Sequence, residues 1–202
     1  MKLYYRPMAC SFAVHVALRK AGMAPELIQY DPATGKSADG RIFAEHYRKA
    51  YVPVLIDADG EVMTEVVSLM IELDERFPQA NLLPKERKAR RRAIEWLAFT
   101  SAEIHKSYIA DIFADIPQTE DIIAARQKVE ARLNYVAERV PTDSRFLFND
   151  ELTAVDCFLL VMLLWTDHAR IDIARWPQLA AYRERLMGEA PVVEAMKAEG
   201  LV

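Results

Sequence analysis

The residue with the clearest chemical potential is a cysteine near the start of the chain. Cys10 follows an apolar segment, Leu3 to Tyr5, and a turn that contains Pro7. A helical pattern of apolar residues begins close to Ser11, so the Cys10 thiol is expected beside a helix N-terminus. Unpaired backbone N–H groups and the helix dipole favour an anion there, and such a thiol ionises more readily than a free cysteine. The alternative is that Cys10 is a small apolar residue packed under the turn.

The first 78 residues alternate between strand and helix patterns. We expect strands at 2–5, 26–30, 52–56 and 61–64, and helices at 11–21 and 65–77. The segment 31–41 is rich in Gly, Ser and Asp and is typical of a loop, whereas Asp57–Gly60 is typical of a tight hairpin turn. This order predicts an α/β sandwich around a small mixed sheet.

The second half of the chain is expected to be entirely helical. From Lys85 onward no strand pattern is found. The expected helices are one that includes 94–112 and ends before Pro117, a second at 119–139, the most apolar one at 153–169, and two shorter ones that begin near Pro177 and Pro191. The sequence therefore predicts an α/β domain at 1–78 and an all-helical domain at 85–202.

Composition narrows the class of protein. The chain has 202 residues, 52% of them hydrophobic and 28% charged, with a net charge of −4, as in soluble globular proteins that bind neither nucleic acid nor membranes. No apolar run reaches the roughly 18 residues that span a bilayer, and no signal peptide is recognised. Two cysteines and four scattered histidines offer neither a disulfide framework nor a metal site. We expect a cytoplasmic protein without a metal.

Six short motifs then resemble, in order along the whole chain, those of the cytosolic glutathione transferases, most closely the bacterial beta class. They are Met1–Tyr5, Ala9-Cys10-Ser11, Val52-Pro53, Asp59-Gly60 with Thr64-Glu65, Glu103–Lys106, and Thr153–Asp156. The resemblance implies a thioredoxin-like N-terminal domain, an all-helical C-terminal domain and a homodimer. It also implies an enzyme that conjugates glutathione, its co-substrate, to hydrophobic electrophiles.

The resemblance assigns the binding of glutathione to the first domain. It implies a cis peptide bond at Val52–Pro53 that exposes the backbone of Val52 to the cysteinyl part of glutathione, where the alternative is an ordinary trans proline. Glu65 would pair with the γ-glutamyl ammonium, while the free N–H groups of the helix that starts at Glu65 and Val66 bind a carboxylate. Alternatively, Glu65 is only a favourable acid in the first turn of a helix.

The resemblance implies catalytic roles for Cys10, Ser11 and His105. Cys10 would stabilise the glutathione thiolate or form a mixed disulfide with glutathione, and Ser11 would donate to the sulfur or cap the first helix. His105 and Lys106, on a helix of the second domain, would reach the sulfur or the carboxylates of glutathione. The alternative for His105 is a polar residue on a helix packing face.

Plausible walls for the electrophile are Tyr108, Ile109 and Trp165, for which the alternative is plain core packing. Two departures from the family pattern lie at the expected ligand. Val66 replaces the usual Ser or Gly, and the segment 46–51 lacks the Pro and Gly of the usual Asn-Pro-x-Gly-x. They leave two other functions open, namely a glutathione-dependent thiol–disulfide reductase that uses Cys10, or a non-catalytic member with a degenerate glutathione site.

Overall fold

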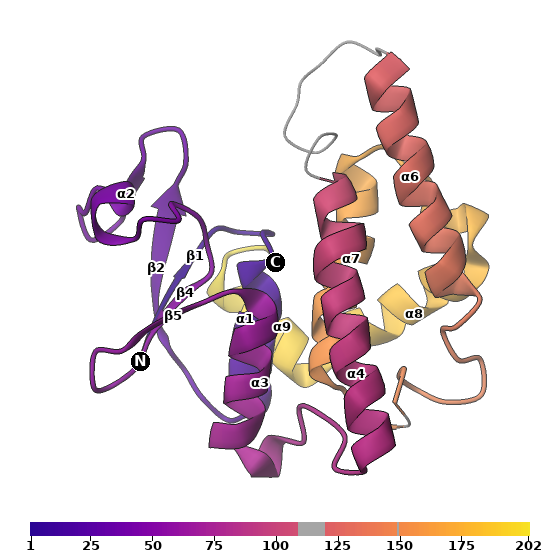
Figure 1. Ribbon diagram of the computed structural model, residues 1–202, viewed down its shortest axis with the longest axis horizontal. Helices are drawn as coiled ribbons and strands as arrows, with labels where there is room; N and C mark the ends of the chain where they lie inside the picture. Colours follow the sequence, from indigo (N-terminus) through magenta and orange to yellow (C-terminus); the bar gives the residue numbers. More distant parts are fainter. Residues whose placement is uncertain (109–119, 149) are drawn as a thin grey trace. The chain divides into compact units, whose positions relative to one another are not determined.

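The computed structural model describes residues 1–108, 120–148 and 150–202 of the chain. The described residues form two compact units (Figure 1). The first comprises Met1–Leu82 together with Ala190–Val202, and the second comprises Leu83–Glu189.

The first unit is built on a five-stranded mixed sheet. Its strands are β1 (Lys2–Tyr5), β2 (Glu26–Asp31), β3 (Lys36–Ser37), β4 (Val54–Ile56) and β5 (Val62–Thr64). They lie in the order β3-β2-β1-β4-β5, with β1 parallel to β2 and the other neighbours antiparallel. The expected β-α-β unit followed by a hairpin is confirmed, and the two-residue strand β3 adds an edge that the pattern of residues 31–41 did not predict.

The helices of the first unit are α1 (Ser11–Lys20), α2 (Phe43–His46), α3 (Val66–Arg76), the 3₁₀ turn η1 (Pro78–Ala80) and α9 (Ala190–Ala198). Helix α1 packs against both α3 and α9. Eight of its ten residues are buried. It is therefore the central helix of this unit.

The last helix differs from its expected place, because residues 190–202 were expected with the helical domain. Helix α9 instead lies on α1 in the first unit. The contact includes a fully buried pair in which Nδ1 of His15 lies 2.8 Å from Oε1 of Glu199. Burial raises the pKa of the Glu199 carboxyl above its usual value, while the neighbouring His15 acts in the opposite direction.

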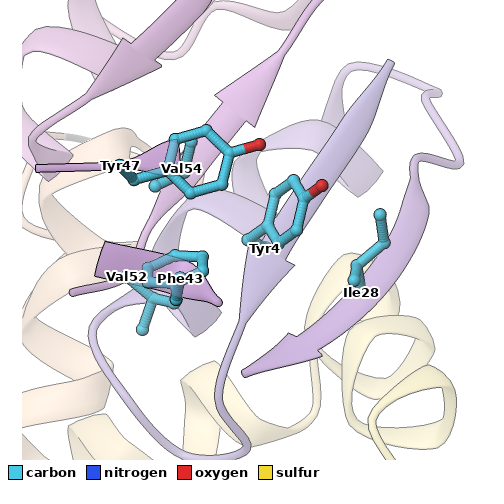
Figure 2. Packing of buried hydrophobic residues seen from close by; sticks show 6 residues of the cluster. All are labelled: Tyr4, Ile28, Phe43, Tyr47, Val52 and Val54. Atoms are coloured by element: carbon cyan, nitrogen blue, oxygen red, sulfur yellow. The ribbon is translucent and has the colours of Figure 1, made fainter. Parts of the chain in front are cut away.

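A cluster of buried side chains fills the first unit on the side of α2 (Figure 2). Tyr4, Phe43 and Tyr47 form a triangle of tilted rings with centroids 4.9 to 5.7 Å apart. Ile28 of β2, Val54 of β4 and Val52, which precedes β4, complete the cluster. Such aromatic contacts hold the segment between α2 and β4 against β1.

The turn between β4 and β5 is organised by one carboxylate. Asp57 accepts hydrogen bonds from the backbone N–H groups of Asp59 (2.9 Å) and Glu61 (3.0 Å) and from Nη1 of Arg76 (3.2 Å). Gly60 takes the left-handed conformation, with φ of 86°. The expected hairpin turn at 57–60 is confirmed, and its Asp and Gly both serve it.

The second unit has no strand among its described residues. Its elements are α4 (Arg87–Phe99), the π-helical segment η2 (Thr100–His105), α6 (Glu120–Ala137), α7 (Ala154–His168), η3 (Ile173–Arg175) and α8 (Pro177–Met187). Helix α7 packs on α4, η2 and α8, and thirteen of its fifteen residues are buried. The most apolar predicted helix is thus the centre of this unit. Nowhere in the described segments is a helix long and apolar enough to cross a bilayer.

The start of α7 is fixed by a buried carboxylate. Asp156 accepts hydrogen bonds from the backbone N–H of Thr153 (2.7 Å), the Thr153 hydroxyl (2.6 Å) and the N–H of Leu147 (3.1 Å). The hydroxyl of Tyr182 on α8 donates to it as well. The expected capping-box spacing is confirmed, and the same side chain ties α7 to α8 and to the loop before it.

Candidate active site

Cys10 lies where the sequence predicted, at the N-cap of α1. Its side chain makes no capping bond to the helix. The Cys10 thiol instead donates to the backbone carbonyl oxygen of Val52, with Sγ and O 3.4 Å apart. The side chain is partly exposed, unlike the buried Cys157 of α7. Two predicted site residues, 42 positions apart, are therefore in direct contact.

Ser11 is directed toward the turn before α1. Its buried hydroxyl accepts a hydrogen bond from the backbone N–H of Arg6 (3.2 Å) and donates to the carbonyl oxygen of the same residue (3.3 Å). The hydroxyl proton is thus engaged within the turn that carries Cys10. A direct contact between Ser11 and the glutathione sulfur remains a prediction.

The peptide bond between Val52 and Pro53 is cis, which confirms that expectation. The side chain of Val52 is buried in the cluster of Figure 2, together with Phe43 and Val54. Its carbonyl group nevertheless meets the partly exposed Cys10 thiol. The Val52 side chain anchors the backbone, and the carbonyl group is left for polar contacts.

Glu65 begins α3 in an unusual conformation. It is the N-cap residue, with φ of 72° and ψ of 119°, which a non-glycine residue rarely adopts. The first helical hydrogen bond runs from the Leu69 N–H to the Glu65 carbonyl at 2.9 Å, so the N–H groups of Val66, Val67 and Ser68 have no partner within the helix. The Val66 side chain is buried. This helix start has the strain and the free donors typical of an anion-binding position.

Two residues at Glu65 were missed by the sequence analysis. Nζ of Lys49 lies 2.6 Å from Oε1 of Glu65 and 3.2 Å from Oγ1 of Thr64, and the Tyr51 hydroxyl donates to the same Glu65 oxygen at 2.7 Å. The carboxylate raises the pKa of both the Lys49 ammonium and the Tyr51 hydroxyl. Both belong to the segment 46–51 that departs from the family pattern. The sequence signal that could have indicated these contacts is a lysine and a tyrosine just before Val52-Pro53.

A second group of predicted residues lies together in the second unit. His105 ends the π-helical segment η2, and its ring centroid lies 5.2 Å from that of Trp165 and 6.1 Å from that of Phe158 on α7. Tyr108 meets Trp165 edge-on at 5.9 Å. The π turn interrupts what was expected as a regular helix, a feature often found at functional positions.

The other predicted residues of this group differ in exposure. Tyr108 and Trp165 are buried, and burial raises the pKa of the Tyr108 phenol above its usual range. Its hydroxyl has no hydrogen-bond partner among the described residues. Lys106 is exposed. Ile109, the remaining predicted wall, lies outside the described residues.

The described residues also hold a cavity of about 360 Å³ in the second unit. It is lined by Arg92, Glu95, Trp96, Phe99, Tyr135, Arg139, Leu147 and Phe148. No predicted site residue is among them. Within residues 1–108, 120–148 and 150–202, no group of three or more His, Cys, Asp or Glu side chains is placed to hold a metal ion.

Comparison with known proteins decides the family. Residues 61–185 match the family model described as "Glutathione S-transferase, C-terminal domain". The chain belongs to the glutathione S-transferase family. It is 31% identical, over the full length of both chains, to the glutathione S-transferase GstA of Escherichia coli O157:H7.

Two solved structures of the family are similar along the whole chain. The beta class glutathione S-transferase of Sphingomonas chungbukensis is 34% identical with a TM-score of 0.91, and all of both chains is covered. A sphingomonad glutathione S-transferase solved in complex with glutathione is 32% identical with a TM-score of 0.91, again over both entire chains. This glutathione S-transferase is therefore a transferase with the mixed-sheet and helical domains of its family.

Proposed function

We propose that this glutathione S-transferase conjugates the glutathione thiolate to hydrophobic electrophiles. The observation that carries the proposal is the grouping, within the first unit, of the Cys10 thiol, the Val52 carbonyl and the N-terminus of α3 with Glu65. These groups match the parts of glutathione, which has a thiol, peptide groups, and an ammonium beside a carboxylate. A structurally similar transferase was solved with glutathione bound.

Each group then has a role in binding glutathione. The γ-glutamyl carboxylate binds the free N–H groups at the start of α3, and the ammonium pairs with the Glu65 carboxylate. The backbone of Val52 binds the cysteinyl part. Val66 has no hydroxyl for the carboxylate, so the backbone N–H groups supply that contact alone.

Cys10 acts on the sulfur of glutathione. When glutathione binds, the partly exposed Cys10 thiol turns its hydrogen from the Val52 carbonyl to the sulfur of glutathione. This hydrogen bond favours the thiolate near neutral pH, and the proton of the glutathione thiol leaves to solvent. The thiolate attacks the electrophilic carbon, a carbon–sulfur bond forms, and the leaving group departs with its electron pair. His105, which lies beside Trp165, and its chain neighbour Lys106 are proposed to supply positive or hydrogen-bonding groups, and Tyr108 and Trp165 to contact the electrophile.

We extend the proposal to the cellular setting of the protein. The protein acts in the cytoplasm as a homodimer, and its role is the detoxification of electrophiles.

The test combines calorimetric titration with glutathione and a chloronitrobenzene conjugation assay. The wild-type protein binds glutathione in the micromolar to low-millimolar range and turns over. Cys10→Ala lowers kcat by about tenfold or more, because removing one donor to a developing or bound anion costs up to ~10²–10³-fold. The control is Cys157→Ala, because it removes the other thiol, which is buried in α7.

The result that contradicts the proposal is equally clear. No heat and no turnover at millimolar glutathione would exclude both glutathione-using functions. Disulfide reduction that requires Cys10, without conjugation, would instead identify the reductase.

A further inference from the structure

The segment before the cis-proline, which departs from the family pattern, places a cation on Glu65. Residues 46–51 connect α2 to Val52, and Lys49 and Glu65 form an ion pair at 2.6 Å in which each side chain is 49% exposed. Tyr51 donates to the same oxygen of Glu65. One carboxylate oxygen thus accepts from two side chains of this segment.

The backbone of the segment is held on both sides of Lys49. Tyr47 is buried among Tyr4 and Phe43, and Val52 belongs to the same cluster (Figure 2). Between them Ala50 adopts a left-handed φ of 54° and donates its N–H to the Tyr47 carbonyl at 2.8 Å. A non-glycine residue is strained there. A tight turn fixed at both ends therefore positions Lys49 beside Glu65.

The Lys49 side chain carries the same chemical group as the expected ligand. Its primary ammonium has three donor hydrogens, as does the α-ammonium of a γ-glutamyl group. The Lys49 ammonium and the ligand ammonium can both form an ion pair with the Glu65 carboxylate. One oxygen of this carboxylate already accepts hydrogen bonds from Lys49 and Tyr51. An ammonium that binds this same oxygen therefore displaces Lys49 or Tyr51 from it.

We propose that Lys49 is an internal competitor for the ammonium position of glutathione on Glu65. This inference rests on the proposed function. Binding of the γ-glutamyl ammonium exchanges one ion pair for another, so the net gain from that ammonium is small. A site whose binding-competent form is only partly populated has its apparent affinity lowered by that fraction. Lys49 thereby sets the affinity for glutathione and the selectivity for its ammonium group.

The test compares two ligands on four proteins by calorimetry. The ligands are glutathione and its desamino analogue, in which hydrogen replaces the γ-glutamyl ammonium. The proteins are the wild type, Lys49→Met, Lys49→Arg and the control Lys2→Met. Lys2 forms an exposed ion pair with Glu26 at 3.3 Å in the same unit, so its replacement removes the same charge from a similar pair.

Lys49→Met is expected to bind glutathione up to about fivefold more tightly, the range given by exposed ion pairs. Its affinity for the desamino analogue stays within error of the wild type, so discrimination between the two ligands increases. Lys49→Arg and Lys2→Met retain the wild-type ratio.

Unchanged or weaker glutathione binding by Lys49→Met would overturn the inference, as would an equal change for both ligands. Each of these results leaves the proposed function in place, because the wild type still binds glutathione. If none of the four proteins binds glutathione, the proposed function itself fails.

Discussion

Replacing Asp156 should cost more stability than any other single exchange proposed for this chain. Its buried carboxylate accepts hydrogen bonds from the Thr153 N–H and hydroxyl, the Leu147 N–H and the Tyr182 hydroxyl. Asp156→Ala leaves these four donors without their acceptor. Thr153 is 3% exposed and Tyr182 fully buried, so water cannot readily replace the lost oxygen atoms.

The magnitude follows from the number of orphaned donors. A buried donor left unpaired costs about 1–3 kcal/mol, and partial relaxation of the Thr153 hydroxyl and the Leu147 loop reduces the sum. We expect a loss of about 3–5 kcal/mol, a large part of the roughly 5–15 kcal/mol that stabilises a typical domain. Tyr182→Phe, which removes only one donor, should cost about 1–2 kcal/mol.

Urea unfolding followed by circular dichroism and tryptophan fluorescence measures these losses. The double variant, Asp156→Ala with Tyr182→Phe, has no Tyr182 hydroxyl to leave without an acceptor. The double variant should therefore lose less stability than the sum of the losses in the two single variants. A loss below about 1 kcal/mol for Asp156→Ala, or strict additivity, would refute the view that this carboxylate holds α7, α8 and the preceding loop together.

Two further predictions concern pH. Hydrogen bonds from the Glu61 N–H and from Arg76 lower the pKa of Asp57 below its usual 3.8, so this carboxylate stabilises the fold above that pH and the contribution is lost as the pH falls through the lowered pKa. Asp57→Asn should therefore be less stable than the wild type in urea unfolding at pH 7, and the difference should shrink steadily toward pH 2; a constant difference would count against this. Burial raises the pKa of Glu199 above 4.5, so its contribution is largest below pH 4.5 and is lost as the pH rises through the raised pKa. As the pH rises from 4.5 to 8, the free energy of unfolding of Glu199→Gln should fall less than that of the wild type. Parallel pH profiles of the two proteins in urea unfolding would contradict a raised pKa for Glu199.

Local patterns predicted most of the first unit and the start of α7 in the second unit. The hairpin at 57–60 was predicted from Asp57 and Gly60. In the structure Asp57 accepts the Glu61 N–H and Gly60 adopts a left-handed φ. The start of α7 followed in the same way from Thr153 and Asp156. These features depend on neighbours within a few residues, which a sequence displays directly. Strand β3 was missed because two residues, Lys36 and Ser37, are too few to show an alternating pattern.

The contacts that were missed join residues far apart in the chain. Lys49 and Tyr51 reach Glu65 across the β4–β5 hairpin, and no periodicity relates residues 14 and 16 positions apart in different elements. The π turn that ends at His105 has the same apolar spacing in sequence as the helix around it. The cis bond at Val52–Pro53 was expected only from resemblance, since a proline at a strand start is as compatible with a trans bond.

The return of α9 to the first unit also affects how the protein is made. The core around α1 contains His15 from the beginning of the chain and Glu199 from its last residues. A ribosome releases residues 190–202 only after every residue of the second unit has been synthesised. Chains usually fold domain by domain from the N-terminus during synthesis, but here helix α1 cannot complete its packing before α9 is made. Before residues 190–202 are synthesised, the second unit is already complete in sequence, whereas the first unit still lacks α9.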